Sequence, residues 1–465
     1  MARPAPATHH PRSRLGTAVL ALAVALLSPH AAPASEPGPP RVVEAAPDQG
    51  DDAVDPDLRV LRVRFDRPMT PGGHSICGGG PSFPTPAGRP HWADEHTVLI
   101  PVRLEPGKTY SLGINCPAAK NFRSAQGEPA EPFPLTFRTR GRGEPPPPAA
   151  TITPEAALGV LDALRTAIDT RYSHRDLHRV DWPARLAEAA PVFAAATSRA
   201  QLGRAVLAAL APCRDPHLTV RWGVAVVGVP TREVTPNVNV QTLRRLVPGY
   251  TEAGQFAAWG RFGEGEAATG YIAIHAWPGD PDGLKPAHDA LTALAACKTL
   301  VVDVRANAGG DELAARRFAA RFLDRPAVYS RNDSRDPASP TGFGRMLDRA
   351  IEPAPEAERF TGRVALLIGP ACMSSNESFI AMMLTSPRVT TLGATTRGSS
   401  GNPKPTDLGQ GITVLLPSWR DFLPDGSPLE GRGIAPTIPI DASVNALAKR
   451  DPVLHGALDH LLSNP

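Results

Sequence analysis

The 465-residue chain lacks several short patterns that mark common protein classes. Its five cysteines form no C-x-x-C pair, which excludes a zinc ribbon and a thioredoxin-like motif. It also lacks an H-E-x-x-H metal motif, a correctly spaced G-x-G-x-x-G loop and a G-x-S-x-G nucleophile elbow. Without a metal motif around them, His174 and His178 are interpreted as solvated helix histidines, and no metal or organic cofactor is expected.

An excess of charge of one sign is also missing. The formal net charge is +3, and three arginines in residues 1–34, which contain no acidic residue, account for it. The rest of the chain is formally neutral. Because nucleic-acid binding needs a dense basic surface, the composition excludes a nucleic acid as partner.

Long apolar runs are absent outside the leader. Residues 1–34 combine the arginines with an apolar stretch from Leu15 to Leu27 and a small-x-small site at Ala32-Pro33-Ala34. The stretch is too short to span a membrane, so it predicts a cleaved export signal and a periplasmic or extracellular protein without stable membrane insertion. A retained anchor is the alternative. In an oxidising compartment Cys77 and Cys116 could pair, or remain two buried thiols.

The remaining sequence predicts a multidomain protein. Residues 40–140 are predicted to be all-β, because apolar and polar residues alternate with period two over 58–65. The Pro-rich residues 141–150 predict a stiff linker. Helical periodicity follows over 151–217, with Thr153 as N-cap and Pro154 at the first helical position. Alternating strands and helices over 218–445 predict a layered α/β domain, before a C-terminal helical tail at 446–465.

The β segment resembles the bacterial SbsA-like Ig-like domain. The residues that carry this resemblance are Phe65–Met69 and Leu104–Tyr110. The resemblance implies a small β-sandwich that could bind a surface or a protein partner.

Four separated segments place reactive groups at predicted strand–helix turns and loops. The turn over 303–310 is rich in glycine and precedes a helix, which suits an oxyanion, and the turn over 370–377 presents a pair of serines. Asp215-Pro216-His217 offers a base, and the segment 429–436 offers a carboxylate that could orient an imidazole. Each segment alone also has an ordinary structural explanation, such as helix capping or tight packing.

Taken together, these segments make residues 155–440 similar to the tail-specific, or carboxyl-terminal-processing, serine proteases and their tricorn-type relatives. The matching patterns are D-x-R-x-N-x-G-G at 303–310, S-x-x-E at 374–377, G-x-x-T-x-G at 393–398 and E-G-x-G-I-x-P at 430–436. The resemblance implies an α/β core of the ClpP/crotonase-like kind. It implies Ser374 as nucleophile and an oxyanion hole from the backbone amides of Gly310 and Ser375.

The chain departs from the branch that uses a serine–lysine dyad. The position of the general-base lysine, 25 residues after the serine, holds Ser399, and the nearest lysine is Lys404. The 53 residues between His217 and Tyr271 are too few for the PDZ domain of that branch. The tricorn-type branch implies His217 as base and Glu430 as its orienting carboxylate.

These patterns predict an exported serine endopeptidase that cleaves unfolded or extended polypeptides through an acyl-enzyme. Asp303, Arg305, Asn307 and Glu377 are expected to hold the turns rather than to react. The alternatives are a Ser374/Lys404 dyad protease, an esterase with the same acyl-enzyme chemistry, and a non-catalytic ligand-binding or adhesion protein on the same fold.

Overall fold

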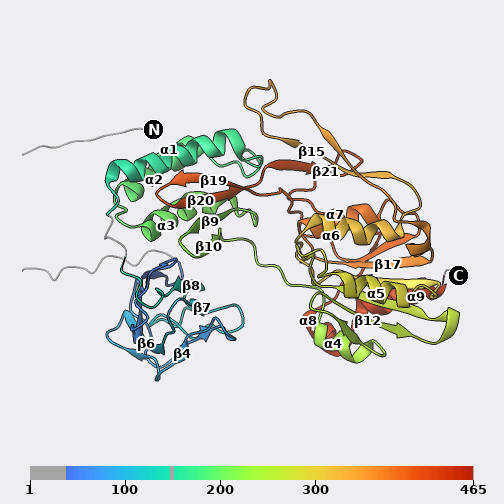
Figure 1. Cartoon of the computed structure of the whole chain (residues 1–465), viewed down its shortest axis with the longest axis horizontal. Helices are drawn as coiled ribbons and strands as arrows, with labels where there is room; N and C mark the ends of the chain where they lie inside the picture. Colours follow the sequence, from blue (N-terminus) through green and yellow to red (C-terminus); the bar gives the residue numbers. More distant parts are fainter. Residues whose placement is uncertain (1–37, 147–150, 464–465) are drawn as a thin grey trace, which may run out of the picture.

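The computed structural model describes residues 38–146 and 151–463 (Figure 1). The predicted export signal lies outside these residues. Within them, none of the helices combines the length and the apolar character that crossing a membrane requires.

The N-terminal part folds as two antiparallel sheets around one buried apolar cluster. One sheet has the order β1-β2-β6-β4 with β5 also on β6, and the other has the order β3-β7-β8. Alternating apolar and polar residues decide which face of each strand points into the cluster. In β2, Leu61, Val63 and Phe65 are fully buried, and the residues between them are exposed or half-buried. A disulfide joins Cys77 to Cys116. The likeness to an Ig-like domain stays a prediction. The strands are β1 Val42–Ala46, β2 Val60–Phe65, β3 Ile76–Cys77, β4 Thr85–Pro86, β5 His91–Trp92, β6 Thr97–Arg103, β7 Thr109–Ile114 and β8 Phe133–Arg138.

Three helices and a four-stranded sheet form the second unit. The helices are α1 Pro154–Arg171, α2 Trp182–Ala194 and α3 Arg199–Leu210. Thr153 caps α1 by accepting the Ala156 amide, as the sequence predicts. The sheet has the order β10-β9-β20-β19, formed by β9 Thr219–Trp222, β10 Ala225–Gly228, β19 Lys404–Gly409 and β20 Ile412–Leu416. The strand at 412–416 lies within the segment 218–445 that the sequence predicts as one α/β domain, but it pairs with β9 in this separate sheet.

A seven-stranded sheet forms the core of the C-terminal part, in the order β11-β12-β13-β14-β17-β18-β22. From β13 to β22 neighbouring strands are parallel, and β11 and β12 add an antiparallel edge. Continuous apolar runs make these strands, because a parallel sheet is covered on both faces. They are β11 Thr251–Ala253, β12 Ala257–Phe262, β13 Thr269–Ile274, β14 Thr299–Asp303, β17 Arg363–Ile368, β18 Val389–Gly393 and β22 Ile438–Pro439.

Helices cover both faces of this sheet (Figure 1). One face packs Leu300 and Val302 of β14 against α5 Lys285–Ala293, α6 Glu312–Ala319 and α7 Ser375–Met383. The other packs Val301 of the same strand against α4 Val240–Leu246 and α9 Pro452–Ser463. The helix α8 Val444–Lys449 lies against α4, so α8 and α9 complete the second layer.

A small antiparallel sheet, in the order β16-β15-β21, packs beside α7. Its strands are β15 Ala327–Ser334, β16 Leu347–Ile351 and β21 Trp419–Phe422. The short 3-10 helices are η1 Ala211–Cys213, η2 Gly265–Ala267, η3 Ala320–Phe322 and η4 Glu356–Glu358. The chain thus crosses between the core and the helical unit several times, and its reactive residues lie near these crossings.

Candidate active site

Ser374 lies between the end of β17 and the first residue of α7. Its φ of 59° and ψ of −134° are unusual for a residue that is not glycine. Such strained backbone concentrates at functional sites. The Ser374 amide donates to the Ser399 carbonyl at 2.7 Å, and within the described part of the chain its hydroxyl makes no hydrogen bond. The half-buried hydroxyl is therefore free to react at the positive end of a helix.

Two glycines of the β14–α6 turn lie directly against Ser374. A Cβ atom on Gly309 would come within 2.8 Å of the Ser374 Cβ, and one on Gly310 within 2.0 Å of the Trp277 carbonyl oxygen. Their φ values of 109° and 135° also belong to glycine. The Ser375 hydroxyl donates to the Gly310 carbonyl at 2.7 Å. In the described residues the amides of Gly310 and Ser375 donate no hydrogen bond, so both are available to an oxyanion beside Ser374.

His217 is brought to the nucleophile through Ser399. Its Nδ1 lies 3.0 Å from the Ser399 hydroxyl, while its Nε2 is buried and has no hydrogen-bond partner among the described residues. Burial lowers the pKa of His217, although the nearby carboxylate of Asp215 opposes the shift. No hydrogen bond joins His217 to Ser374 in the described structure. Because its pKa is lowered, the ring is neutral at pH 7. Nδ1 is engaged by the Ser399 hydroxyl, whereas Nε2 has no hydrogen-bond partner among the described residues.

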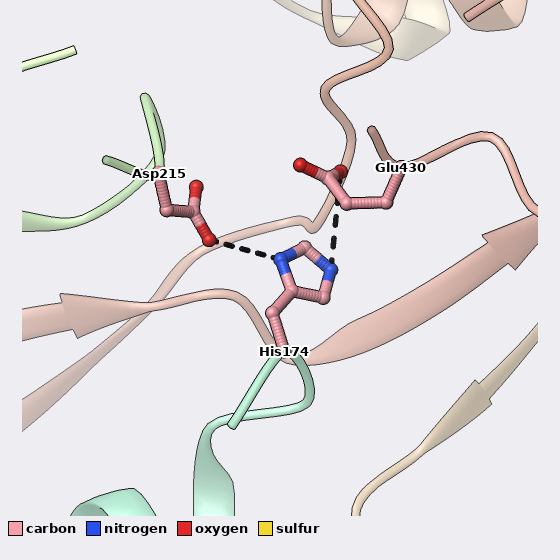
Figure 2. A group of neighbouring side chains, drawn as sticks. All are labelled: His174, Asp215 and Glu430. Carbon is pink, nitrogen blue, oxygen red and sulfur yellow. Dashed lines mark hydrogen bonds and ion pairs between the residues drawn. The ribbon is translucent and has the colours of Figure 1, made fainter. Parts of the chain in front are cut away.

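Glu430 is not in contact with His217, which corrects the predicted arrangement. Its carboxylate accepts the Ser400 amide at 2.6 Å and lies 3.9 Å from Nε2 of His174 (Figure 2). Burial raises the pKa of Glu430 to about 8. The amide contact turns the side chain toward His174, so Glu430 and His217 do not form the expected pair.

His174 is a site residue that the sequence analysis missed. It is buried, with 2% of its surface exposed, and its Nδ1 lies 2.9 Å from Oδ2 of Asp215. The expected solvated helix histidine is therefore wrong, because α1 ends at Arg171 and His174 lies in the following turn. His174, Asp215 and Glu430 offer ligand atoms within 4.8 Å of one another, but a metal ion held by His174 would bind one ring nitrogen and would need both carboxylates on that side of the ring. Figure 2 instead shows the two carboxylates on different nitrogens of the ring, which is the geometry of a hydrogen-bond chain.

Comparison with known proteins identifies the core that carries Ser374, its neighbouring glycines and Glu430. Residues 268–440 match the profile of peptidase family S41. The chain carries a peptidase family S41 domain. Its enzyme class is that of a serine-type peptidase, a hydrolase. No curated protein matches the chain.

Solved structures show the same fold. A putative peptidase from Parabacteroides merdae superimposes with a TM-score of 0.57 at 21% identity, over 67% of this chain and 98% of its own. Mature CPAF superimposes with a TM-score of 0.51 at 11% identity, over 67% and 98%. The tricorn protease reaches a TM-score of only 0.43 at 13% identity, over 89% and 54%. Membership of the tricorn-type branch stays a prediction.

Within the described residues the side chain of Lys404, the alternative base, makes no hydrogen bond or ion pair. Lys404 is the first residue of β19, paired with Leu416, and its side chain is exposed. Ser399 stands where a dyad lysine would be, and it is buried with 1% of its surface exposed. The described residues thus place the ring of His217, from outside the matched region, against Ser399.

The remaining patterned residues hold the turns. Arg305 is fully buried and binds both oxygens of Asp303 and of Asp451, tying β14 to the start of α9. Asn307 accepts the Gly309 amide at 2.7 Å. Glu377 accepts the amides of Gly398 and Ser399 at 2.8 and 2.9 Å. Its burial raises its pKa to about 7. These contacts position the peptidase loops without touching the Ser374 hydroxyl.

A cleft of about 710 Å³ opens at Ser374. Gly310, Ser374 and Ser375 line it, together with Leu313 and Leu347, whose side chains are 57% and 52% exposed. A second cavity of about 450 Å³ lies in the N-terminal β unit, and no carboxylate lines it. Ser374 and the two amides beside it therefore line the cleft between α6, α7 and the small β15 sheet.

Proposed function

We propose that this protein is an exported serine endopeptidase that cleaves extended polypeptides at Ser374. The observation that carries the proposal is the strained Ser374 beside two unused amides, those of Gly310 and Ser375. A serine needs both a base and an oxyanion site to act on an acyl group. The cleft at Ser374 is open along the exposed side chains of Leu313 and Leu347, which suits an extended chain.

In the proposed reaction, Nε2 of His217 takes the proton of the Ser374 hydroxyl as its oxygen bonds to the peptide carbonyl carbon. The amides of Gly310 and Ser375 stabilise the resulting oxyanion, and the protonated His217 then protonates the leaving amine. Water, activated by the same histidine, hydrolyses the ester of Ser374. The Ser399 contact fixes Nδ1 of His217, which leaves Nε2 for these proton transfers.

The test is hydrolysis of casein by the mature chain, from Ser35, across pH 5–10. Ser374→Ala, His217→Ala and Lys404→Ala are compared with the wild type, together with labelling by a serine-reactive phosphonate. We expect Ser374→Ala and His217→Ala to lose activity roughly 10⁴-fold or more, and Lys404→Ala to keep it.

Other outcomes separate the alternatives. Loss of activity with Lys404→Ala but not His217→Ala would replace the histidine mechanism by a serine–lysine dyad. Cleavage of a p-nitrophenyl ester without cleavage of casein would indicate an esterase. A folded wild type that neither cleaves casein nor labels at Ser374 would overturn the proposal in favour of ligand binding or adhesion.

A further inference from the structure

A single buried carboxylate, that of Asp215, contacts two histidines. Its Oδ2 accepts the Tyr172 hydroxyl at 3.0 Å and faces Nδ1 of His174 at 2.9 Å. Its Oδ1 accepts the backbone amide of His217 at 2.9 Å and lies 3.9 Å from Nδ1 of that ring. Asp215 and its partners His174 and Tyr172 have 3% or less of their surface exposed. The carboxylate therefore connects His174 to the turn that carries His217.

The contacts of His174 define its protonation state. Nδ1 faces the Asp215 carboxylate, and Nε2 lies 3.1 Å from the Trp419 carbonyl oxygen. Both partners only accept hydrogen bonds, so both nitrogens must carry a proton and the ring is an imidazolium. Although burial disfavours the charged form, the hydrogen bond to Asp215 and the charge of Asp215 raise the pKa of His174.

This charge matters for His217. The charged groups that face His217 are Asp215, His174 and Arg397. Asp215 alone would favour the protonated ring, whereas the two cations oppose it. The His174–Asp215 ion pair thus holds the 215–217 turn in place, and the positive charge of His174 opposes the effect of Asp215 on the His217 ring.

We propose that His174 is a positioning residue of the peptidase site, which clamps Asp215 and through it fixes the orientation of the His217 ring. The proposal rests on the proposed function, in which His217 is the base. Glu430 then acts on the network through His174, rather than on His217 directly.

The test compares two uncharged replacements of His174. In His174→Asn the amide nitrogen takes the place of Nδ1 and keeps a donor to Asp215, whereas in His174→Gln it takes the place of Nε2 and leaves Asp215 without that donor. We expect kcat on casein peptides to fall about 100-fold in His174→Gln and about 10-fold in His174→Asn, with KM little changed, because a misplaced base affects the transition state. On the acidic side of the pH profile, kcat/KM falls as His217 becomes protonated. Both variants should raise the midpoint of that fall by about one pH unit.

Two further variants control for a general loss of packing. Tyr172→Phe removes a hydrogen bond to the same Oδ2 but no charge, so it should lower kcat a few-fold without moving the midpoint of the pH profile. The double variant His174→Gln/Asp215→Asn removes the unbalanced carboxylate, so the midpoint should return toward the wild-type value. A midpoint that moves equally in Tyr172→Phe would show that the effect is structural and overturn the proposal.

Histidine NMR provides a readout that does not need activity. In protein with ¹⁵N-labelled histidine, His174 should show two protonated ring nitrogens at pH 7, and the pKa of His217 should rise in His174→Gln. A neutral His174 in the wild type, or a His217 pKa that is the same in both proteins, would overturn the inference. Absence of casein cleavage with the expected NMR result would instead overturn only the proposed function.

Discussion

The proposed nucleophile lies on a local strand–turn–helix unit, whereas the proposed base lies where four distant segments meet. Ser374 and the proposed oxyanion amides follow two neighbouring parallel strands, β14 and β17, whose carboxyl ends lie at one edge of the sheet. The base side combines the turn after α1, the segment after α3, the loop before β19 and the segment after β21. The first arrangement follows from strand order, and the second depends on how separate units pack.

The largest effect on the nucleophile side is expected for Gly310→Ala. A Cβ atom there would lie 2.0 Å from a backbone carbonyl oxygen, and the φ of 135° is strained for alanine, so the peptide must move. Loss of one oxyanion donor lowers kcat by about 10²–10³-fold. The measurement is kcat, KM and the melting temperature of the variant.

Gly127→Ala is a matched control for this change. Gly127 also has a positive φ, of 83°, but a Cβ atom there meets nothing within 4 Å. It should share the backbone strain, about 1 kcal/mol, and keep wild-type kcat. Unchanged kcat in Gly310→Ala would mean that the Gly310 amide does not bind the oxyanion.

Glu430→Gln should have a smaller effect, and it tests the base side. If Glu430 oriented His217 directly, its loss would lower kcat about 10⁴-fold, as in a conventional triad. Because it contacts His174 and the Ser400 amide instead, we expect a decrease of about 10-fold or less. The measurement is kcat of Glu430→Gln beside that of His174→Gln. A 10⁴-fold lower kcat in Glu430→Gln, with the melting temperature of the wild type, would show that Glu430 orients His217 as in a conventional triad.

The same contrast explains how far the sequence could predict this molecule. The buried strands at 300–304 and 364–368, the Gly309-Gly310 turn and Ser374 were predictable because each is a local pattern whose geometry follows from chain direction. The pairing of β20 in a separate sheet was not predictable, since nothing in its apolar run names β9 as its partner. His174 was missed because its importance arises only when Asp215, Trp419 and Glu430 converge on it.

Glu377 lies between the two sides and should affect stability more than rate. It belongs to the helix that follows Ser374, and it binds the amides of Gly398 and Ser399 in the loop that contacts His217. Burial raises its pKa from 4.5 to about 7 in the folded protein. The folded state therefore binds the proton more tightly than the unfolded state, so this residue favours folding below pH 4.5, and that contribution is lost as pH rises toward 7.

Glu377→Gln should remove this pH dependence, because an amide keeps an oxygen to accept from the loop but has no proton to lose. Urea unfolding at pH 5 and pH 8 gives the comparison. Wild type should lose on the order of 2 kcal/mol more than the variant between the two values, whereas kcat at pH 8 should change only a few-fold. An identical pH dependence in both proteins would show that Glu377 is ionised over this range. Its contacts to the loop would then be those of a carboxylate, which would hold Ser399, and with it His217, more firmly than a protonated acid does.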